Sequence, residues 1–212
     1  MDSFGKKVYR VIKRLLDILF CIIGLVFAFI PMIIISILIK LDDKGPVLFK
    51  QKRTGYKGRE FNLYKFRTMT VNNDVHDFKH KDQHTKIGTV LRKLSLDELP
   101  QMINVLKGDM SFIGPRPWIT DYWKNMNDEQ RHRCDVLPGI TGLAQAKGRN
   151  NITIFDKINY DLEYIRDYSF IEDVKVIFLT IKTVLSKSGA DAGKDTIHNE
   201  LEDLHNSNAV NA

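Results

Sequence analysis

Leu94-Ser95-Leu96-Asp97-Glu98-Leu99-Pro100-Gln101 is the stretch around which the chain is organised, and it holds two adjacent carboxylates. Ser95 and Glu98 have the spacing of a capping box, in which each side chain binds a free backbone N–H at a helix start. Pro100 favours a later start with Asp97 as the cap, because proline is tolerated only in the first helical turn. In both alternatives the acids lie at the positive end of the helix dipole, which favours their ionised forms.

Apolar periodicity on both sides of this stretch predicts two helices that meet at the carboxylates. The apolar residues recur at helical spacing from residue 87 to residue 107, and Gly108 ends the second helix. Further helices are predicted over residues 154–167 and, from a second capping box at Ser169 and Glu172, as far as Gly189. The apolar side of that last helix suits either a protein core or a membrane surface.

Residues 40–70 have the alternating, β-branched and aromatic character of a β-hairpin around a glycine turn at 54–58. The segment carries nine Lys or Arg residues against three acids, a net charge of +6. Its basic side chains face lipid headgroups or phosphate, or they only discourage aggregation of an edge strand. Arg67 lies in an apolar context that fits the last explanation poorly, and we include it with Lys65 among the candidate phosphate-binding residues.

An apolar run without one charged side chain covers residues 18–39. At about 1.5 Å per residue, a helix of this length would cross a hydrocarbon core of about 30 Å. Basic residues flank the run on both sides, whereas a single crossing concentrates them on one side. Pro31 lies within the run and would kink a helix. A re-entrant helix that bends at Pro31 and leaves on the side where it entered satisfies both observations, and a straight crossing is the alternative.

The composition of the 212-residue chain limits its partners. A formal net charge of +6 predicts an anionic partner such as nucleic acid, a lipid headgroup or a phosphorylated substrate. Cys21 and Cys134 are far apart, so neither a disulfide framework nor a zinc site is predicted. His76, His80 and His84 have a spacing that can bind a metal, but the polar run around them is more typical of a solvated loop.

These patterns predict an α+β fold that is mostly helical, with an N-terminal re-entrant membrane helix, a small β-hairpin and amphipathic interfacial helices. The expected organisation is a basic N-terminus with the membrane helix over residues 1–39 and a cytosolic catalytic domain over residues 40–189. The polar, acidic residues 190–212 are predicted to be a disordered tail.

The chemistry that fits the paired acids is phosphoryl transfer. The chain contains no Walker loop, dinucleotide glycine fingerprint or Gly-x-Ser-x-Gly elbow. Glycoside hydrolysis needs two acids that face each other across a sugar, which adjacent residues do poorly. One carboxylate would instead act as a nucleophile while Mg²⁺ screens the phosphate charges.

Two further segments offer phosphate ligands. Prolines after Gly114 and after Arg116 hold Arg116 extended, which suits bidentate phosphate recognition, although an arginine in an ordinary turn has the same pattern. The turn at residues 138–142 has glycines that permit close backbone approach to a ligand, and Arg149 follows it.

Several motifs, in order over residues 10–186, make the chain resemble the bacterial sugar transferases, the monotopic polyprenyl-phosphate phosphoglycosyl transferases. They agree with that family in spacing as well as residue type, and the length resembles its short members. The motifs are Lys13-Arg14-x-x-Asp17, Lys65-Phe66-Arg67-Thr68-Met69, Arg92-Lys93 with the stretch 95–101, Asn104-Val105-Leu106-Lys107-Gly108-Asp109-Met110-Ser111, Gly114-Pro115-Arg116-Pro117 and Pro138-Gly139-Ile140-Thr141-Gly142.

The resemblance implies transfer of a sugar 1-phosphate from a UDP-sugar to undecaprenyl phosphate, with release of UMP. The expected location is the cytoplasmic face of the bacterial inner membrane, and the product would initiate a surface glycan such as exopolysaccharide or capsule. The implied partners are a UDP-sugar, undecaprenyl phosphate and membrane lipid, with no nucleic acid. The family's N-terminal helix is re-entrant, which implies structural roles here for Lys13, Arg14, Asp17 and Pro31.

Site roles also follow from the resemblance. Asp97 matches the nucleophile that forms a covalent phosphosugar intermediate and also contacts Mg²⁺. Glu98 would assist, by positioning the metal or by deprotonating the lipid phosphate. Arg92 and Arg116 match positions that contact phosphate or nucleotide, and the remaining candidates for this role are Lys65, Arg67 and Arg149.

The chain departs from the family pattern at two places. Ile30 precedes Pro31 where the family usually has serine, so one hydrogen bond that supports the bend is missing. The run Asp82-Gln83-His84-Thr85 replaces an Asp-Pro-Arg-Ile-Thr-like run, which removes an arginine contact. The competing hypothesis from another class is a non-enzymatic, membrane-anchored module whose basic hairpin binds anionic lipid or nucleic acid.

Overall fold

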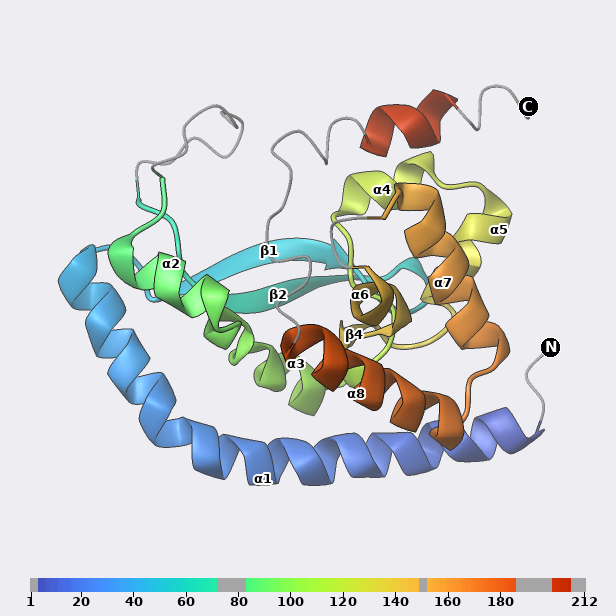
Figure 1. The fold of residues 1–212 in the computed structure, drawn as a ribbon, viewed down its shortest axis with the longest axis horizontal. Coiled ribbons are helices and arrows are strands. Elements are labelled where there is room, and N and C mark those ends of the chain that lie inside the picture. The colour runs from blue at the N-terminus through green and yellow to red at the C-terminus, as the bar shows by residue number, and fades with distance from the viewer. Residues whose placement is uncertain (1–3, 72–82, 149–151, 186–199, 207–212) are drawn as a thin grey trace.

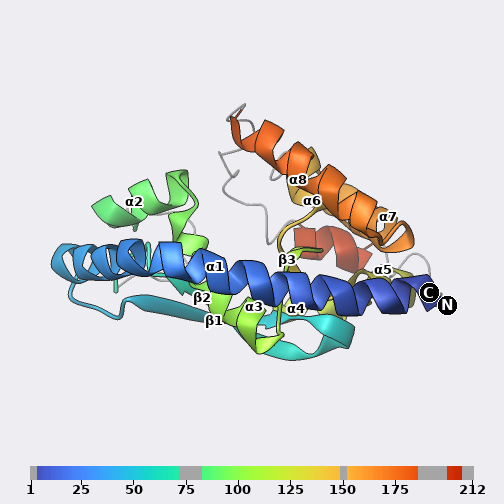
Figure 2. The ribbon, with the colours of Figure 1, turned by 90° about the horizontal axis from the view of Figure 1, so that it is seen from below.

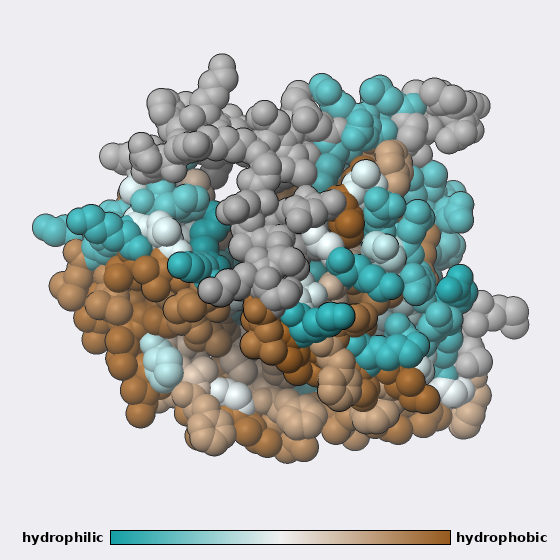
Figure 3. Space-filling view, viewed as in Figure 1, coloured by the Kyte–Doolittle hydropathy of each residue, from teal (hydrophilic) through white to brown (hydrophobic). Residues whose placement is uncertain are grey.

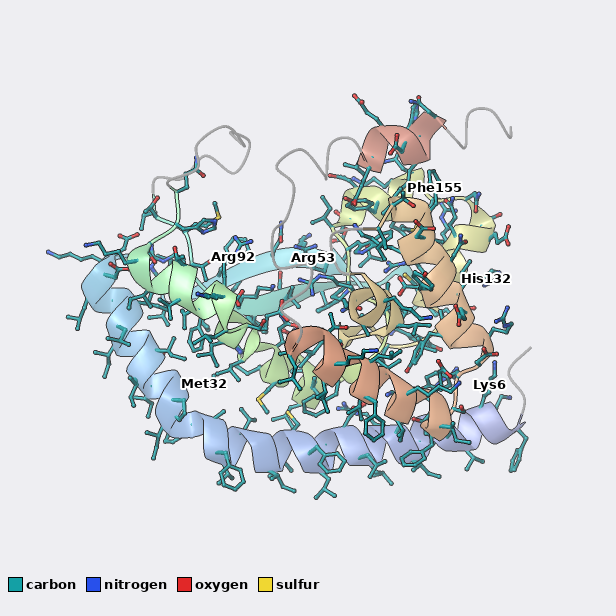
Figure 4. The ribbon with its side chains drawn as sticks, in the orientation of Figure 1. Lys6, Met32, Arg53, Arg92, His132 and Phe155 are labelled. Carbon is teal, nitrogen blue, oxygen red and sulfur yellow. The ribbon has the colours of Figure 1, made fainter. Side chains whose placement is uncertain are left out.

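The computed structural model describes residues 4–71, 83–148, 152–185 and 200–206. Helix α1 (Phe4–Asp42) runs along one side of all other elements, and its C-terminal third bends toward them (Figure 1). The bend lies near Met32, next to Pro31 (Figure 4). Proline cannot donate the backbone hydrogen bond that a straight helix needs, which accounts for the bend. Ser36 Oγ donates to Met32 O at 2.6 Å, so a serine after the proline supports the bend that lacks a serine before it.

The side of α1 that faces away from the other elements is apolar. Helix α1 is long and apolar enough to cross a membrane by length and composition, and little of its most apolar part is buried. Figure 3 shows this surface as a continuous hydrophobic band along the lower edge. Exposed apolar surface of this extent marks a membrane or protein contact.

Each end of α1 contacts other elements of the described chain. Near its start, Lys6 Nζ donates to Ile165 O at 3.0 Å, and near its end Ile39 is buried against Phe66 and Leu91. Helix α1 is thus in contact with the rest of the described chain at both of its ends.

The three polar motif residues in the first half of α1 each bind a different element. Lys13 forms a buried ion pair with Asp173. Arg14 donates to the last carbonyls of helix α3 (Gln101–Lys107), including Val105 O at 2.5 Å. Asp17 accepts hydrogen bonds from the Ser111 hydroxyl and from a backbone N–H of strand β3 (Ser111–Ile113). These contacts hold the first half of α1 against the rest of the domain.

The predicted β-hairpin is confirmed. Strands β1 (Leu48–Thr54) and β2 (Glu60–Phe66) pair antiparallel, with Gln51 opposite Leu63. The short helix η1 (Tyr56–Gly58) makes the turn, where Lys57 and Gly58 have positive φ angles. The described residues also contain a second pair, β3 with β4 (Gly139–Thr141), which is parallel and was not predicted.

The predicted helices on either side of the carboxylates are α2 (Lys86–Lys93) and α3, joined by the 3₁₀ helix η2 (Leu96–Glu98). The expected side-chain caps are wrong. Ser95 adopts a left-handed conformation with no capping hydrogen bond, and α3 has no side-chain cap. Carbonyls of the preceding turn satisfy the free N–H groups instead, as in Met102 N to Leu99 O at 3.1 Å, so no side chain is needed.

The remaining helices lie in the right-hand half of Figure 1, above the N-terminal half of α1. They are α4 (Thr120–Asn125), α5 (Asp128–Arg131), η3 (His132–Cys134), α6 (Leu143–Lys147), α7 (Ile154–Arg166) and α8 (Phe170–Leu185). Helix α8 begins as predicted, with the Glu172 N–H donating to Ser169 Oγ at 3.3 Å, whereas Gly189 lies outside the described residues. Seen from below, α8 diverges from α1 (Figure 2).

The expectation of a disordered tail is wrong for residues 200–206, which form a helix. Leu204 is fully buried in a cluster with Trp118 and Ile158, and Glu200 accepts from the Tyr122 hydroxyl at 2.7 Å. Composition could not reveal this docking, because it depends on one leucine that meets a distant apolar surface. The other residues of the tail lie outside the described residues.

Candidate active site

The paired carboxylates meet basic side chains from two other parts of the chain. Lys65 of β2 places Nζ 2.6 Å from Glu98 Oε1 and 3.9 Å from Asp97 Oδ2. Arg116, from the segment after β3, places Nη2 3.2 Å from the same Glu98 oxygen. One oxygen of Glu98 therefore binds two cations, while the Asp97 carboxylate receives no side-chain hydrogen bond from any described residue.

The two carboxyl groups differ in ionisation. Burial raises the pKa of Asp97 above its usual range, and the charge of Lys65 only partly offsets this. Burial acts on Glu98 in the same direction, but the charges of Arg116 and Lys65 outweigh it and lower the pKa of Glu98 to about 2. The expectation that the helix start favours ionisation of both acids is wrong for Asp97, because the loss of water outweighs the dipole.

We expect opposite stability changes from neutralising the two acids. The Glu98 carboxylate stabilises the fold above its unfolded pKa, and this contribution is lost as pH falls toward about 2. Asp97, with a raised pKa, favours the fold below its unfolded pKa and loses that contribution as pH rises through its folded pKa. At pH 7, Glu98→Gln should therefore cost on the order of 2 to 4 kcal/mol, whereas Asp97→Asn should raise the melting temperature. A lower melting temperature in both variants than in the wild type would contradict this assignment.

Arg92 is a further cation whose charge acts on Asp97. Its charge favours ionised Asp97, and its Nη1 lies 3.2 Å from His84 Nε2. His84 Nδ1 lies 3.4 Å from Thr68 O, and because arginine can only donate, His84 Nε2 is the acceptor in its contact with Arg92. His84 is thus a partner of Arg92, while His76 and His80 lie outside the described residues. Among the described residues, no three His, Cys, Asp or Glu side chains cluster as metal ligands.

The structure does not bring every predicted residue to the dyad. Arg67 Nη1 donates to Asp43 Oδ2 at 2.6 Å, and Arg67 Nη2 donates to Asp43 O at 2.6 Å. Arg67 thus holds the segment that follows α1. Arg149 lies outside the described residues.

The glycines of the 138–142 turn closely approach the protein backbone. A Cβ atom on Gly139 would lie 2.1 Å from Gly114 N, and one on Gly142 would lie 2.2 Å from Gly114 O. Close packing of β4 and the 114–117 segment requires glycine at both positions. This packing supports the backbone that presents Arg116.

A buried ion pair also holds the Arg116 segment. Arg133 Nη2 donates to Arg116 O at 2.8 Å and to Asp161 Oδ2 at 2.6 Å. The Arg133 guanidinium lies 3.6 Å from the centre of the Trp118 ring, and both charged side chains of the pair are almost fully buried. The sequence analysis did not identify these residues, because no local pattern links position 133 to positions 116 and 161.

Arg53 of β1 is a further cation of this centre that the sequence analysis missed. Its Nη1 donates to Pro117 O at 3.4 Å, which places it beside the segment that carries Arg116. In the sequence, only its position in the basic hairpin pointed to a role in anion binding. The centre therefore combines two unequal carboxylates with four cations: Arg53, Lys65, Arg92 and Arg116.

The oxygen ligands suit a magnesium ion shared with a substrate. Mg²⁺ is commonly held by one or two carboxylates together with substrate phosphates and water. The Asp97 carboxylate, which is free of side-chain hydrogen bonds from the described residues, fits that role, and Glu98 lies beside it.

Comparison with known proteins identifies the family. A family model described as bacterial sugar transferase matches residues 8–187. The chain belongs to the bacterial sugar transferases. This bacterial sugar transferase is 45% identical to the galactosyl transferase CpsE of Streptococcus agalactiae, over 89% of the chain and 45% of that protein. It is 42% identical to the uncharacterized sugar transferase EpsL of Bacillus subtilis, over 84% of the chain and 90% of that protein.

A third relative has a more specific name. The UDP-N-acetylgalactosamine-undecaprenyl-phosphate N-acetylgalactosaminephosphotransferase of Aeromonas hydrophila is 40% identical, over 86% of the chain and 46% of that protein. This sugar transferase therefore spans about half the length of two of these relatives and nearly all of EpsL.

The described helices of the sugar transferase expose further apolar surface. Helix α8 exposes large apolar side chains along its length, and Val90 of α2 and Leu94, the residue after α2, are also exposed. This agrees with the prediction of amphipathic helices for an interfacial location. The exposed apolar residues of α8 are Phe170, Ile171, Ile177, Phe178, Ile181, Val184 and Leu185.

Proposed function

We propose that this sugar transferase moves a sugar 1-phosphate from a UDP-sugar to undecaprenyl phosphate and so initiates a surface glycan such as exopolysaccharide or capsule. The observation that carries the proposal is the unequal dyad: a buried Asp97 free of side-chain hydrogen bonds from the described residues beside a Glu98 held by two cations. Relatives named as undecaprenyl-phosphate sugar-phosphate transferases support the same reaction class.

In the first step, an Asp97 carboxylate oxygen attacks the phosphorus atom that carries the sugar. The bond from that phosphorus to the bridging oxygen breaks, UMP leaves with the bonding electrons, and an aspartyl phosphosugar remains. In the second step, a phosphate oxygen of the lipid attacks the same phosphorus atom. The bond to Asp97 breaks, which releases the polyprenyl diphosphate sugar and restores the carboxylate.

The neighbouring groups support these steps electrostatically. A carboxylate with a pKa of about 2 is a weak base at neutral pH, so Glu98 positions Lys65 and Arg116 and does not deprotonate the lipid phosphate. Arg92 and Arg116 bind phosphate oxygens of the substrates. When bound at Asp97, Mg²⁺ would screen the negative charge of the donor phosphates.

The direct test is a panel of UDP-sugars offered to the full-length protein with undecaprenyl phosphate, read by UMP release. Release with at least one donor, dependent on the lipid and on Mg²⁺, is the expected result. The competing anchor module predicts no release from any donor and instead anionic-lipid binding that weakens with salt and does not depend on Asp97. That outcome would refute the proposal.

The location that we propose is the cytoplasmic face of the inner membrane, with α1 re-entrant. In a cysteine-free background, Lys7→Cys and Lys44→Cys lie near the two ends of α1 at exposed positions. Both should react with a membrane-impermeant maleimide only after the cytoplasmic side is opened. Reaction of the two positions from opposite sides would establish a true crossing.

A further inference from the structure

Arg53 is placed in the active centre without the carboxylate partner that a semi-buried arginine usually has. Its Nη2 donates to Gln51 Oε1 at 2.5 Å, and Nη1 donates to Pro117 O at 3.4 Å. Its Nε is buried and has no hydrogen-bond partner among the described residues. Burial and the charge of Arg116 lower the pKa of Arg53 to about 10. The protein thus holds Arg53 near Arg116 at an energetic cost.

The charges of the centre do not balance. The four cations stand against the two carboxylates, which leaves an excess of two positive charges. A bound dianion would remove the repulsion and occupy the free guanidinium donors. Gln51 and Pro117 supply only neutral acceptors to Arg53, so an anionic ligand has no competing carboxylate at this position.

The cations also have an order. Arg53 Nη1 contacts Pro117 O, one residue after Arg116, whereas Arg92 Nη1 contacts His84 Nε2, which precedes α2 in the chain. Arg92 therefore lies at one end of the group and Arg53 at the other.

The two ends differ in their surroundings. The Arg92 end belongs to α2, where Val90 and, just after the helix, Leu94 are exposed, and this suits an acceptor with a prenyl chain. The Arg53 end lies on β1, against the backbone of Pro117.

We propose that Arg53 is a further substrate-binding residue of this sugar transferase, which binds the phosphate group that leaves with the nucleotide. The proposal rests on the function proposed above. With the sugar-bearing phosphorus at Asp97, the second phosphate of the donor extends toward Arg116 and Arg53. Arg53 thereby contacts the nucleotide side of the donor and the released UMP, and it does not contact the lipid phosphate.

The test measures UMP binding to the full-length, detergent-solubilised protein by isothermal titration calorimetry. Loss of a charged hydrogen bond in Arg53→Gln should weaken UMP binding about 10- to 100-fold. Arg53→Lys should recover part of the loss. Arg59→Gln removes an exposed arginine from the same hairpin and should bind UMP like the wild type. If both Arg53→Gln and Arg53→Lys bind UMP with wild-type affinity, the proposal is overturned.

Steady-state kinetics separate this inference from the proposed function. Arg53→Lys, which keeps the charge if Arg53→Gln fails to fold, should raise KM for the UDP-sugar and leave KM for undecaprenyl phosphate unchanged. The reverse pattern would assign Arg53 to the lipid and overturn the inference while the proposed function stands. A wild type that neither binds UMP nor releases it from any donor would refute both.

Discussion

Replacing Asp97 with asparagine is expected to abolish UMP release and the acid-labile phosphosugar adduct. The amide has nearly the same shape as the carboxylate but cannot form the bond to phosphorus, so the first step has no nucleophile. A loss of about 10⁴-fold or more is the expected magnitude for removal of a covalent nucleophile. The measurement is UMP release at saturating donor, together with mass spectrometry of the protein after a brief incubation with the UDP-sugar.

The same variant supplies its own folding control. Because burial raises the pKa of Asp97, Asp97→Asn should melt at or above the wild-type temperature at pH 7. Asp121→Asn, at an exposed position on α4, is a matched change of a carboxylate that should leave turnover unaltered. Wild-type turnover in Asp97→Asn would disprove its role as the nucleophile.

The largest loss of stability is expected from Asp161→Asn. Asp161 and Arg133 are almost fully buried. Burial raises the pKa of Asp161, as it does that of Asp97, but Asp161 is bonded directly to a buried guanidinium, so its removal leaves the arginine charge uncompensated in a medium with little water. The loss should be about 3 to 5 kcal/mol in the free energy of unfolding, measured by chemical denaturation in detergent. Turnover should fall as well, because Arg133 holds the Arg116 carbonyl.

A matched control lies on the surface of the same region. Asp128 pairs with Arg131 at 3.2 Å but is almost fully exposed. Asp128→Asn should therefore change stability by no more than about 1 kcal/mol. Similar losses in the two variants would show that the buried pair contributes no more than an exposed one.

Much of the fold could be predicted because it depends on local patterns. The hairpin follows from alternation around a glycine turn, and α2, α3, α7 and α8 follow from helical periodicity. The β3–β4 pair could not be predicted in this way. Its strands have three residues each and are separated by the whole of α4 and α5, so no local repeat signals the pairing. The buried position of Leu204 was missed for the same reason.

For the site, the motifs identified the dyad and three of its cations, Lys65, Arg92 and Arg116. They did not distinguish the ionisation of the two acids, since that depends on burial and on charges carried by β2 and by the segment after β3. They also grouped Arg67 with the phosphate ligands, whereas the structure joins it to Asp43.

The sequence by itself determined which chemical groups are present and where the chain turns, because periodicity, glycine and proline act over a few residues. The tertiary structure alone decided that Asp97 is buried without a strong partner while Glu98 binds two cations. It also decided that Arg53 joins the centre and that a buried Arg133 supports Arg116. These properties arise from residues far apart in sequence, and desolvation and charge act through space and not along the chain.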